Sequence, residues 1–279
     1  MTLTVNQALD AYEAARRLTV AEPGNIKYIT RAARRILGDV LARDVTQAVI
    51  DQFVSRRQAE GAGLQTARRD LTAVMSALRM ANRRGEIPAP RYIVLPPRGT
   101  ARQRFLTPDE TQRLIQSAAD PRLRLYIQLG LATAARRGAL CDLTWDRVDL
   151  DRGIIDFRAP HPRAAQRKGR AVVPISAKII AVLADHRAAT QGDLVIGLRG
   201  PAVQYHFKRA VARAGLGPEV TPHVLRHTAA SFMVKSVPLI IASRMLGHSN
   251  TKITESVYVH VTADDLRPAA DALDGIIQA

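Results

Sequence analysis

The chain has almost no cysteine, few aromatic residues and no long apolar run. Its single cysteine among 279 residues excludes an intrachain disulfide framework, and the apolar neighbours of Cys141 favour a packed, reduced thiol. No stretch of about 18 apolar residues offers a membrane span, and no early apolar run resembles a signal peptide. We therefore expect an intracellular protein, cytoplasmic or associated with the nucleoid, with no membrane partner.

Acidic residues are also scarce relative to basic ones. Asp and Glu number 25 against 41 Lys and Arg, which gives a formal net charge of +16. The excess is spread along the chain, because residues 1–105 hold 18 of the basic and 9 of the acidic residues. GC-rich codon usage also enriches arginine, but a surplus of this size favours a polyanionic partner such as DNA, contacted by both parts of the chain.

Residues 1–98 predict an all-α domain, because helical patterns alternate with polar breaks and no strand period is present. Apolar residues recur at helical spacing after Thr4 and after Thr46, and both threonines suit an N-cap. A fourth helix is expected from about Thr66 to Arg84. Its outer positions favour either a solvated surface or a face laid on the phosphate backbone, and they carry Arg68, Arg69, Arg79, Arg83 and Arg84.

Residues 99–105 predict a linker between two domains. The prolines before it, from Pro88 to Pro97, interrupt any helix and favour extended backbone. Arg102 and Arg104 give the linker positive charge. If two domains close around a duplex, the linker must cross a strand, and Arg102 is then expected to face phosphate.

Residues 106–279 predict a second domain that is mainly α with a small antiparallel β element. The sequence predicts a helix that starts at Thr107, because proline occupies the first helical position and acidic residues follow in the first turn. An apolar helix is expected over about 121–134. Two strand-like runs at 152–157 and 171–175, joined by a basic loop, predict a β-hairpin.

The C-terminal part gathers side chains suited to one reaction. His223, Arg226 and His248 precede a lone tyrosine, Tyr258. A phenol has a pKa of about 10, so reaching the phenolate at neutral pH costs roughly 4 kcal/mol. Arginine offers planar, bidentate donors for phosphate oxygens, and histidine donates to them or relays a proton. The set therefore predicts attack by tyrosine on a phosphodiester.

A zinc site built from the histidines is the alternative for the same segment. Four histidines lie close in sequence, but no cysteine partner or His-Glu-x-x-His helix accompanies them. We therefore expect no metal and no other cofactor. The four are His223, His227, His248 and His260.

The second half of the chain resembles the catalytic domain of the tyrosine recombinases, the phage integrase family. The family pattern has an arginine in a Thr-Gly-x-Arg-x-x-Glu-Leu segment, a β-hairpin lysine, His-x-x-Arg, Leu-Gly-His and a nucleophilic tyrosine. The corresponding residues here, in the same order, are Arg136, Lys168, His223, Arg226, His248 and Tyr258. The resemblance implies a mixed α/β recombinase domain over 106–279, preceded by a helical core-binding (SAM-like) domain over 1–98.

Two positions depart from the family pattern. Ala134 replaces the glycine, and Ala139 replaces the glutamate that supports the arginine. Arg137 is the alternative to Arg136, and Arg167 is the alternative to Lys168 because hairpin turns vary in length. We choose Lys168 because it is the only lysine in the hairpin.

The resemblance also implies a mechanism. Tyr258 attacks a DNA phosphodiester, which leaves a 3′-phosphotyrosine and a free 5′-hydroxyl, with neither metal nor ATP. Arg136 and Arg226 hold the non-bridging oxygens, and His248 donates to them. His223 orients or accepts the tyrosine proton, and Lys168 protonates the leaving oxygen.

The expected partner is double-stranded DNA carrying a core recombination site. A helix over 263–279 is expected either to pack on its own domain or, as in family members, on a neighbour in a cyclic tetramer, while the free protein is a monomer. Accessory DNA-bending proteins are possible partners. The alternatives are a type IB topoisomerase-like DNA-relaxing enzyme and a catalytically retired DNA-binding regulator.

Overall fold

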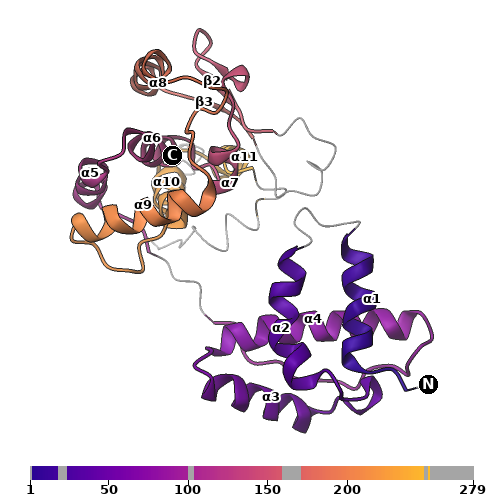
Figure 1. The fold of residues 1–279 in the computed structure, drawn as a ribbon. Helices are drawn as coiled ribbons and strands as arrows, with labels where there is room; N and C mark the ends of the chain where they lie inside the picture. The colour runs from indigo at the N-terminus through magenta and orange to yellow at the C-terminus, as the bar shows by residue number, and fades with distance from the viewer. Residues whose placement is uncertain (1, 18–23, 100–103, 159–170, 248–250, 252–279) are drawn as a thin grey trace, which may run out of the picture. The chain divides into compact units, whose positions relative to one another are not determined.

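The computed structural model describes residues 2–17, 24–99, 104–158, 171–247 and 251. They form two compact units, one before and one after residues 100–103, and each is described on its own (Figure 1). The fold is mainly helical with a small antiparallel sheet, which confirms the predicted fold class.

The first unit is a bundle of α-helices. They are α1 (Val5–Arg17), α2 (Gly24–Leu37), α3 (Gln47–Ala59) and α4 (Leu64–Arg83), with a 3-10 turn at Ala42–Asp44. Thr46 caps α3 as predicted, because its side chain accepts a hydrogen bond from the backbone N–H of Val49. Helix α4 begins after Gly63, slightly earlier than the pattern indicated.

Helix α4 is the centre of the first unit. It packs against the other three helices, and Figure 1 shows it running across α1 and α2. Its inner face is apolar and fully buried at Leu71 and Val74, which join Leu9, Ile50 and Phe53 in one core. Burying each such side chain stabilises the fold by about 1.5–3 kcal/mol. The outer face of α4 is left for polar side chains.

The extended chain after α4 is held to the first unit by polar contacts. The side-chain amide of Gln47 pairs with the backbone of Val94, at 2.9 and 3.2 Å. Arg68 donates to the carbonyls of Leu95, at 3.4 Å, and Pro96. Arg68 therefore has a role in holding the segment that leads toward the linker.

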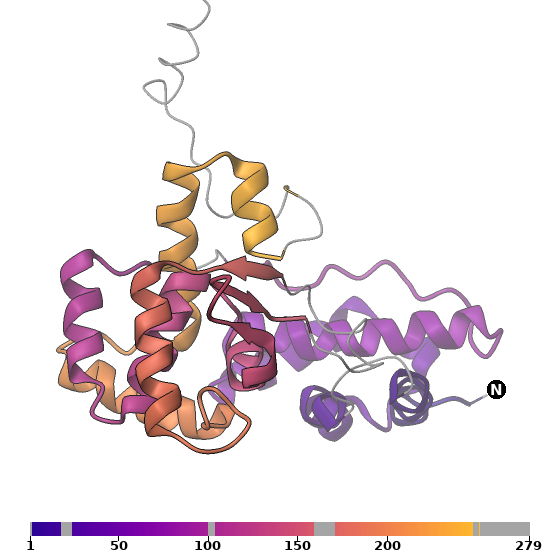
Figure 2. The same cartoon turned by 90° about the horizontal axis from the view of Figure 1, so that it is seen from above.

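The second unit packs its helices around α6. The helices are α5 (Pro108–Ser117), α6 (Pro121–Thr133), α7 (Arg137–Cys141), α8 (Ala177–Ala189), α9 (Gly200–Arg213), α10 (Pro222–Ser236) and α11 (Leu239–Met245). Helix α6 contacts α5, α7, α8, α9 and α10, and its own apolar side chains are buried almost all round. Figure 2 shows α10 and α11 as neighbouring helices on this unit.

The predicted start of α5 is confirmed in detail. Thr107 accepts from the backbone N–H of Glu110 at 3.2 Å, and Glu110 accepts from the backbone N–H of Thr107 at 2.9 Å. This reciprocal capping box satisfies two N–H groups that the helix itself leaves without partners.

Among the described residues, the sheet has three strands in the order β1 (Val148–Asp149), β2 (Ile154–Asp156) and β3 (Val172–Pro174). All pairs are antiparallel, and Ile155 faces Val148 on one side and Val173 on the other. The predicted hairpin corresponds to β2 and β3, and β1 adds a strand that the sequence pattern did not indicate.

Cys141 is half-buried beside the core of the second unit, and burial raises the pKa of its thiol to about 11. The thiol is thus protonated at neutral pH. None of the described helices is long and apolar enough to cross a membrane.

Candidate active site

The first turns of α10 carry two of the predicted site residues. Pro222 occupies the first helical position, and His223 and Arg226 follow three residues apart, so they share a side of the helix. Their environments differ. His223 is exposed, whereas Arg226 is only 4% exposed.

The guanidinium of Arg226 joins three segments of the second unit. Its Nη1 donates to the carbonyl of Ala134 at 2.7 Å, and its Nη2 donates to the carbonyl of Leu246 at 2.8 Å. These carbonyls end α6 and α11, respectively. A buried cation held by two backbone dipoles has a fixed position, because leaving either carbonyl unpaired costs free energy.

The turn between α6 and α7 presents Arg136. Ala134 ends α6 in the left-handed conformation, with φ of 52°, and Arg136 is the residue before the first turn of α7. Thr133 is buried and supports the turn, since its hydroxyl donates to Leu129 at 2.6 Å and accepts from the N–H of Ala135 at 3.3 Å. The family pattern has glycine at position 134, and glycine adopts this conformation without a steric penalty.

Arg136 and Arg226 line the same small cavity, of about 20 Å³. Ala139 also lines it, so the position that carries glutamate in the family pattern lies beside these arginines. Arg137, the alternative to Arg136, is exposed and donates instead to Gln204 of α9 at 3.3 Å. The geometry therefore favours Arg136 as the arginine that acts together with Arg226.

The segments that lead to two other predicted residues also border this cavity. Phe157 and Ala171 line it and pair through a backbone hydrogen bond of 3.0 Å, at the two ends of the hairpin loop. Leu246 lines it as well, two residues before His248. Gly247 follows the end of α11 with φ of 62°, which explains why the Leu-Gly-His motif needs glycine at its centre.

His223 lies against a second histidine of α10. The rings of His223 and His227 meet edge to face, with their centroids 4.6 Å apart. Burial, and then the charge of Arg226, lower the pKa of His227 below its usual range, so the neutral form is favoured. A neutral His227 avoids placing a further cation beside Arg226.

Several predicted residues lie outside the described residues. They are Arg102 of the linker, Lys168 and its alternative Arg167, His248, Tyr258, His260 and the tail helix 263–279. Their assignments rest on the motif alone.

The predicted DNA-binding arginines of the first unit lie along α4 and at its C-cap. Arg69, Arg79, Arg83 and Arg84 are exposed, whereas Arg68 is half-buried against the chain that follows α4. The guanidinium of Arg69 donates a hydrogen bond of 3.4 Å to the buried carboxylate of Asp70. The exposed arginines offer positive charge that a phosphate backbone can contact.

Sequence reasoning missed two groups of residues. In the first unit, α2 exposes Lys27, Tyr28 and Arg31 on one side, and Arg69 of α4 lies 5.6 Å from the centre of the Tyr28 ring. The spacing of apolar residues could not show that Tyr28 of α2 lies near Arg69 of α4. In the second unit, the buried hydroxyls of Thr133 and Thr228 were not predicted to support the site. Their only signal in the sequence is their place in the motifs: Thr133 lies three residues before Arg136, and Thr228 directly follows His227.

Within the part of the chain that the structure describes, no group of three or more His, Cys, Asp and Glu side chains is arranged to hold a metal ion.

Known proteins resemble the chain in sequence and in fold. The model of the phage integrase family matches residues 104–265. The tyrosine recombinase XerA of Thermococcus kodakarensis is 30% identical over 284 residues, which cover 95% of each chain. The tyrosine recombinase XerC of Xylella fastidiosa strain M23 is 29% identical over 260 residues, which cover 88% of this chain and 85% of that protein.

Solved structures share the fold. A lambda integrase dimer bound to a COC′ core site matches with a TM-score of 0.74 and 23% identity, over 92% of this chain and 77% of that one. The Tn1549 transposon integrase in complex with transposon right-end DNA matches with a TM-score of 0.77 and 18% identity, over 98% and 100%. A lambda integrase tetramer bound to a Holliday junction gives 0.74 and 21%, over 94% and 80%.

Proposed function

Because the chain belongs to the phage integrase family and is thus a tyrosine-type site-specific DNA recombinase, we propose that its reaction centre consists of Arg136, Lys168, His223, Arg226, His248 and Tyr258. The observation that carries this proposal is the shared cavity of Arg136 and Arg226. Two guanidinium groups at one cavity suit a phosphodiester, whose transition state spreads charge over its non-bridging oxygens. Each charged hydrogen bond contributes roughly 1.5–3 kcal/mol.

The proposed reaction has two transesterification steps. The Oη of Tyr258 forms a bond to phosphorus while the bond to the 5′-oxygen breaks, and the phenolic proton passes to His223. Lys168 gives a proton to the leaving 5′-oxygen. In reverse, a 5′-hydroxyl of another strand displaces Tyr258 and restores the phosphodiester. The energy of the broken bond is kept in the phosphotyrosine, so rejoining needs no ATP.

The basic residues outside the reaction centre are proposed to bind the DNA backbone. DNA is the partner, and the exposed arginines of α4, with Arg102, are proposed to contact its phosphates in a sequence-independent way.

Assembly on DNA is a separate proposal. We propose that protomers are monomers in solution and assemble as a tetramer on DNA through the tail 263–279, with accessory DNA-bending proteins at some sites. We propose that the reaction takes place on DNA in the bacterial cytoplasm.

Covalent capture tests the proposed function. The full chain is incubated with fragmented DNA of its source genome, denatured, and freed of non-covalent DNA before the attached fragments are sequenced. We expect adducts at a small number of sites, joined through a 3′-phosphate. Tyr258→Phe should abolish them while leaving DNA binding within about twofold, because only the nucleophilic hydroxyl is lost. Adducts that persist in Tyr258→Phe, or none with the unaltered chain, would contradict the proposal.

The same DNA separates recombination from topoisomerase activity, which the relatives do not favour. Supercoiled plasmids with and without the recovered site are compared. Recombinant products from site-bearing plasmids support the proposal. Rapid relaxation of the plasmid without a site, and no exchange between sites, would instead support the relaxing enzyme.

A further inference from the structure

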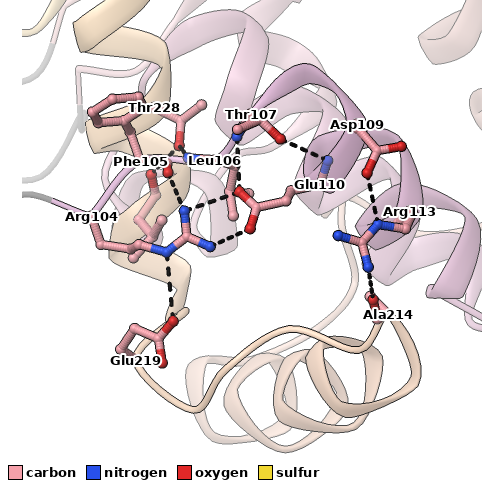
Figure 3. A network of polar contacts seen from close by, with 11 residues as sticks. Arg104, Phe105, Leu106, Thr107, Asp109, Glu110, Arg113, Ala214, Glu219 and Thr228 are labelled. Atoms are coloured by element: carbon pink, nitrogen blue, oxygen red, sulfur yellow. Dashed lines mark hydrogen bonds and ion pairs between the residues drawn. The ribbon is translucent and has the colours of Figure 1, made fainter.

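Residues 104–113 are attached to the catalytic helix α10 and to the turn before it, as Figure 3 shows. This segment begins the described part of the second unit, directly after residues 100–103. Its contacts are polar, partly buried and span more than one hundred residues of sequence. None of the residues that make these polar contacts lines the cavity described above.

Arg104 holds two carboxylates at once. Its Nη2 and Nη1 donate to the two oxygens of Glu110 at 2.5 and 3.0 Å, and its Nε lies 3.5 Å from a carboxylate oxygen of Glu219. Glu110 belongs to α5, whereas Glu219 lies in the turn that connects α9 to α10. Figure 3 shows the guanidinium between the two acids. A planar, bidentate group of this kind fixes orientation as well as distance.

A second attachment is fully buried. The backbone N–H of Leu106 donates to the hydroxyl of Thr228 at 2.9 Å, and this hydroxyl donates to the carbonyl of Val224 at 2.8 Å. Thr228 is 2% exposed and Leu106 is 0% exposed. Water therefore offers no replacement for this bond, and losing it leaves a buried N–H unpaired.

The two attachments bracket the His-x-x-Arg segment. Glu219 lies four residues before His223, and Thr228 lies two residues after Arg226. The chain between them includes the first turns of α10, where His223 is exposed and Arg226 lines the cavity. A shift of residues 104–106 would therefore move both ends of the His-x-x-Arg segment.

We propose that Arg104 and Thr228 are positioning residues for the reaction, which hold the first turns of α10 in the register that places Arg226 and His223 at the phosphate. This inference rests on the proposed function of these two side chains. Residues 104–106 would thus affect the reaction indirectly, because they hold α10 in place. Neither Arg104 nor Thr228 needs to touch DNA for this role.

Single-turnover cleavage measures positioning separately from binding. The substrate is a nicked suicide duplex that carries the cleavage site recovered by covalent capture, and the protein is saturating. Arg104→Met and Thr228→Val should slow adduct formation on the order of 10- to 100-fold, with the dissociation constant within about twofold. Thr228→Ser keeps the hydroxyl and should restore the rate. The double variant Arg104→Met/Thr228→Val should lose less than the product of the two single effects, because both changes loosen one segment.

Arg122→Met is the matched control for Arg104→Met. Arg122 also makes a two-point contact with a carboxylate, to Asp120 at 2.9 and 3.1 Å, but this contact is local to the start of α6, where Asp120 is the N-cap. Its cleavage rate should equal that of the unaltered chain. If Arg104→Met and Thr228→Val weakened only DNA affinity, and their rates at saturation were unchanged, the positioning role would be overturned.

Hydrogen exchange gives a second readout that needs no DNA. Backbone amides of residues 226–230 should exchange faster in Arg104→Met than in the unaltered chain or in Arg122→Met, while the amides of α8 stay unchanged. Equal exchange in α10 would contradict the proposal. If the unaltered chain formed no adduct, the proposed function would fail, yet this measurement would still decide whether Arg104 holds α10.

Discussion

Arg226 combines a structural and a chemical role in one buried side chain. Its guanidinium donates to two carbonyls from chain segments 92 and 20 residues away, and it also lines the cavity with Arg136. A lysine has one ammonium on a flexible stem and cannot reproduce a planar group with donors on two nitrogens. Charge alone is therefore not sufficient at this position.

Arg226→Lys should reduce adduct formation more than 100-fold at saturating protein, on the order of 3 kcal/mol in the barrier. It should also lower the free energy of unfolding by roughly 1.5–3 kcal/mol, because one charged hydrogen bond is lost. Cleavage assays and urea denaturation measure the two effects. Arg213→Lys, at the exposed end of α9, serves as the control and should change neither. Retention of cleavage in Arg226→Lys would argue against a bidentate role.

Motif spacing predicted which residues belong together, but not how each is held. The pattern indicated Arg136 and Arg226, and the structure brings both to one cavity. It could not indicate that Arg226 would be buried, since arginine in a helix is usually exposed. The departure at Ala134 is also clear only in three dimensions: the backbone there is left-handed, and alanine occupies it inside a small apolar cluster with Ala230 and Leu246.

Helix ends position the chemistry at the scale of elements. Helix α6 ends where Arg136 begins its turn, α10 begins just before His223, and α11 ends just before His248. These ends use glycine, proline and threonine, which are strong local signals. The caps at Thr46 and Thr107 could therefore be predicted. Strand β1 could not, because two residues are too few to show an alternating pattern.

Gly247→Ala should destabilise the fold by about 1 kcal/mol, because alanine is strained at a φ of 62°. It should also slow cleavage, since the same turn sets the direction of the chain toward His248. Gly61 gives a matched control: it follows the C-cap of α3 in the first unit with a φ of 80°, and a Cβ there would meet no neighbouring atom. Gly61→Ala should cost similar stability, measured by thermal unfolding, with no change in the cleavage rate. If Gly247→Ala cleaved DNA as fast as the control variant, the turn at Gly247 would have no role in cleavage.

The cap of α5 gives a pH dependence. The hydrogen bonds from Arg104 and then from the backbone of Thr107 lower the pKa of Glu110 to about 2, from an ordinary 4.5. A carboxyl with a depressed folded pKa contributes stability above its unfolded pKa, and this contribution is lost as the pH falls toward the folded value. The stability difference between the unaltered chain and Glu110→Gln should therefore be constant above about pH 5 and shrink toward pH 2. Denaturation at a series of pH values measures it, and a constant difference would show that the carboxylate is not held.

At the scale of the whole molecule, charge decides the mode of binding. The formal charge of +16 is shared by both parts of the chain, and α4 and its C-cap expose arginines in the first unit. Composition was sufficient to predict an anionic partner. It could not separate arginines that hold the protein together from those that face solvent, because that depends on partners such as Leu95 and Asp70.

DNA affinity should fall steeply with salt, because bound phosphates release counterions. Arg79→Gln and Arg83→Gln should each weaken binding by a similar factor on any duplex, and should reduce the slope of log affinity against log salt by about 0.9. Fluorescence anisotropy at several salt concentrations measures the slope. Arg122→Gln should leave it unchanged, since Arg122 already pairs with Asp120. A loss confined to one DNA sequence would mean that these arginines read bases.

The attachment of residues 104–106 has a consequence for exchanging DNA specificity between recombinases. Glu110, Glu219 and Thr228, to which Arg104 and Leu106 are bound, all lie in the second unit. A chimera that takes its first unit from a relative and joins it before Arg104 therefore keeps the support of α10 intact. A junction placed only three residues later, at Thr107, exchanges that support for foreign side chains, and the hybrid then depends on whether its donor supplies an equivalent arginine.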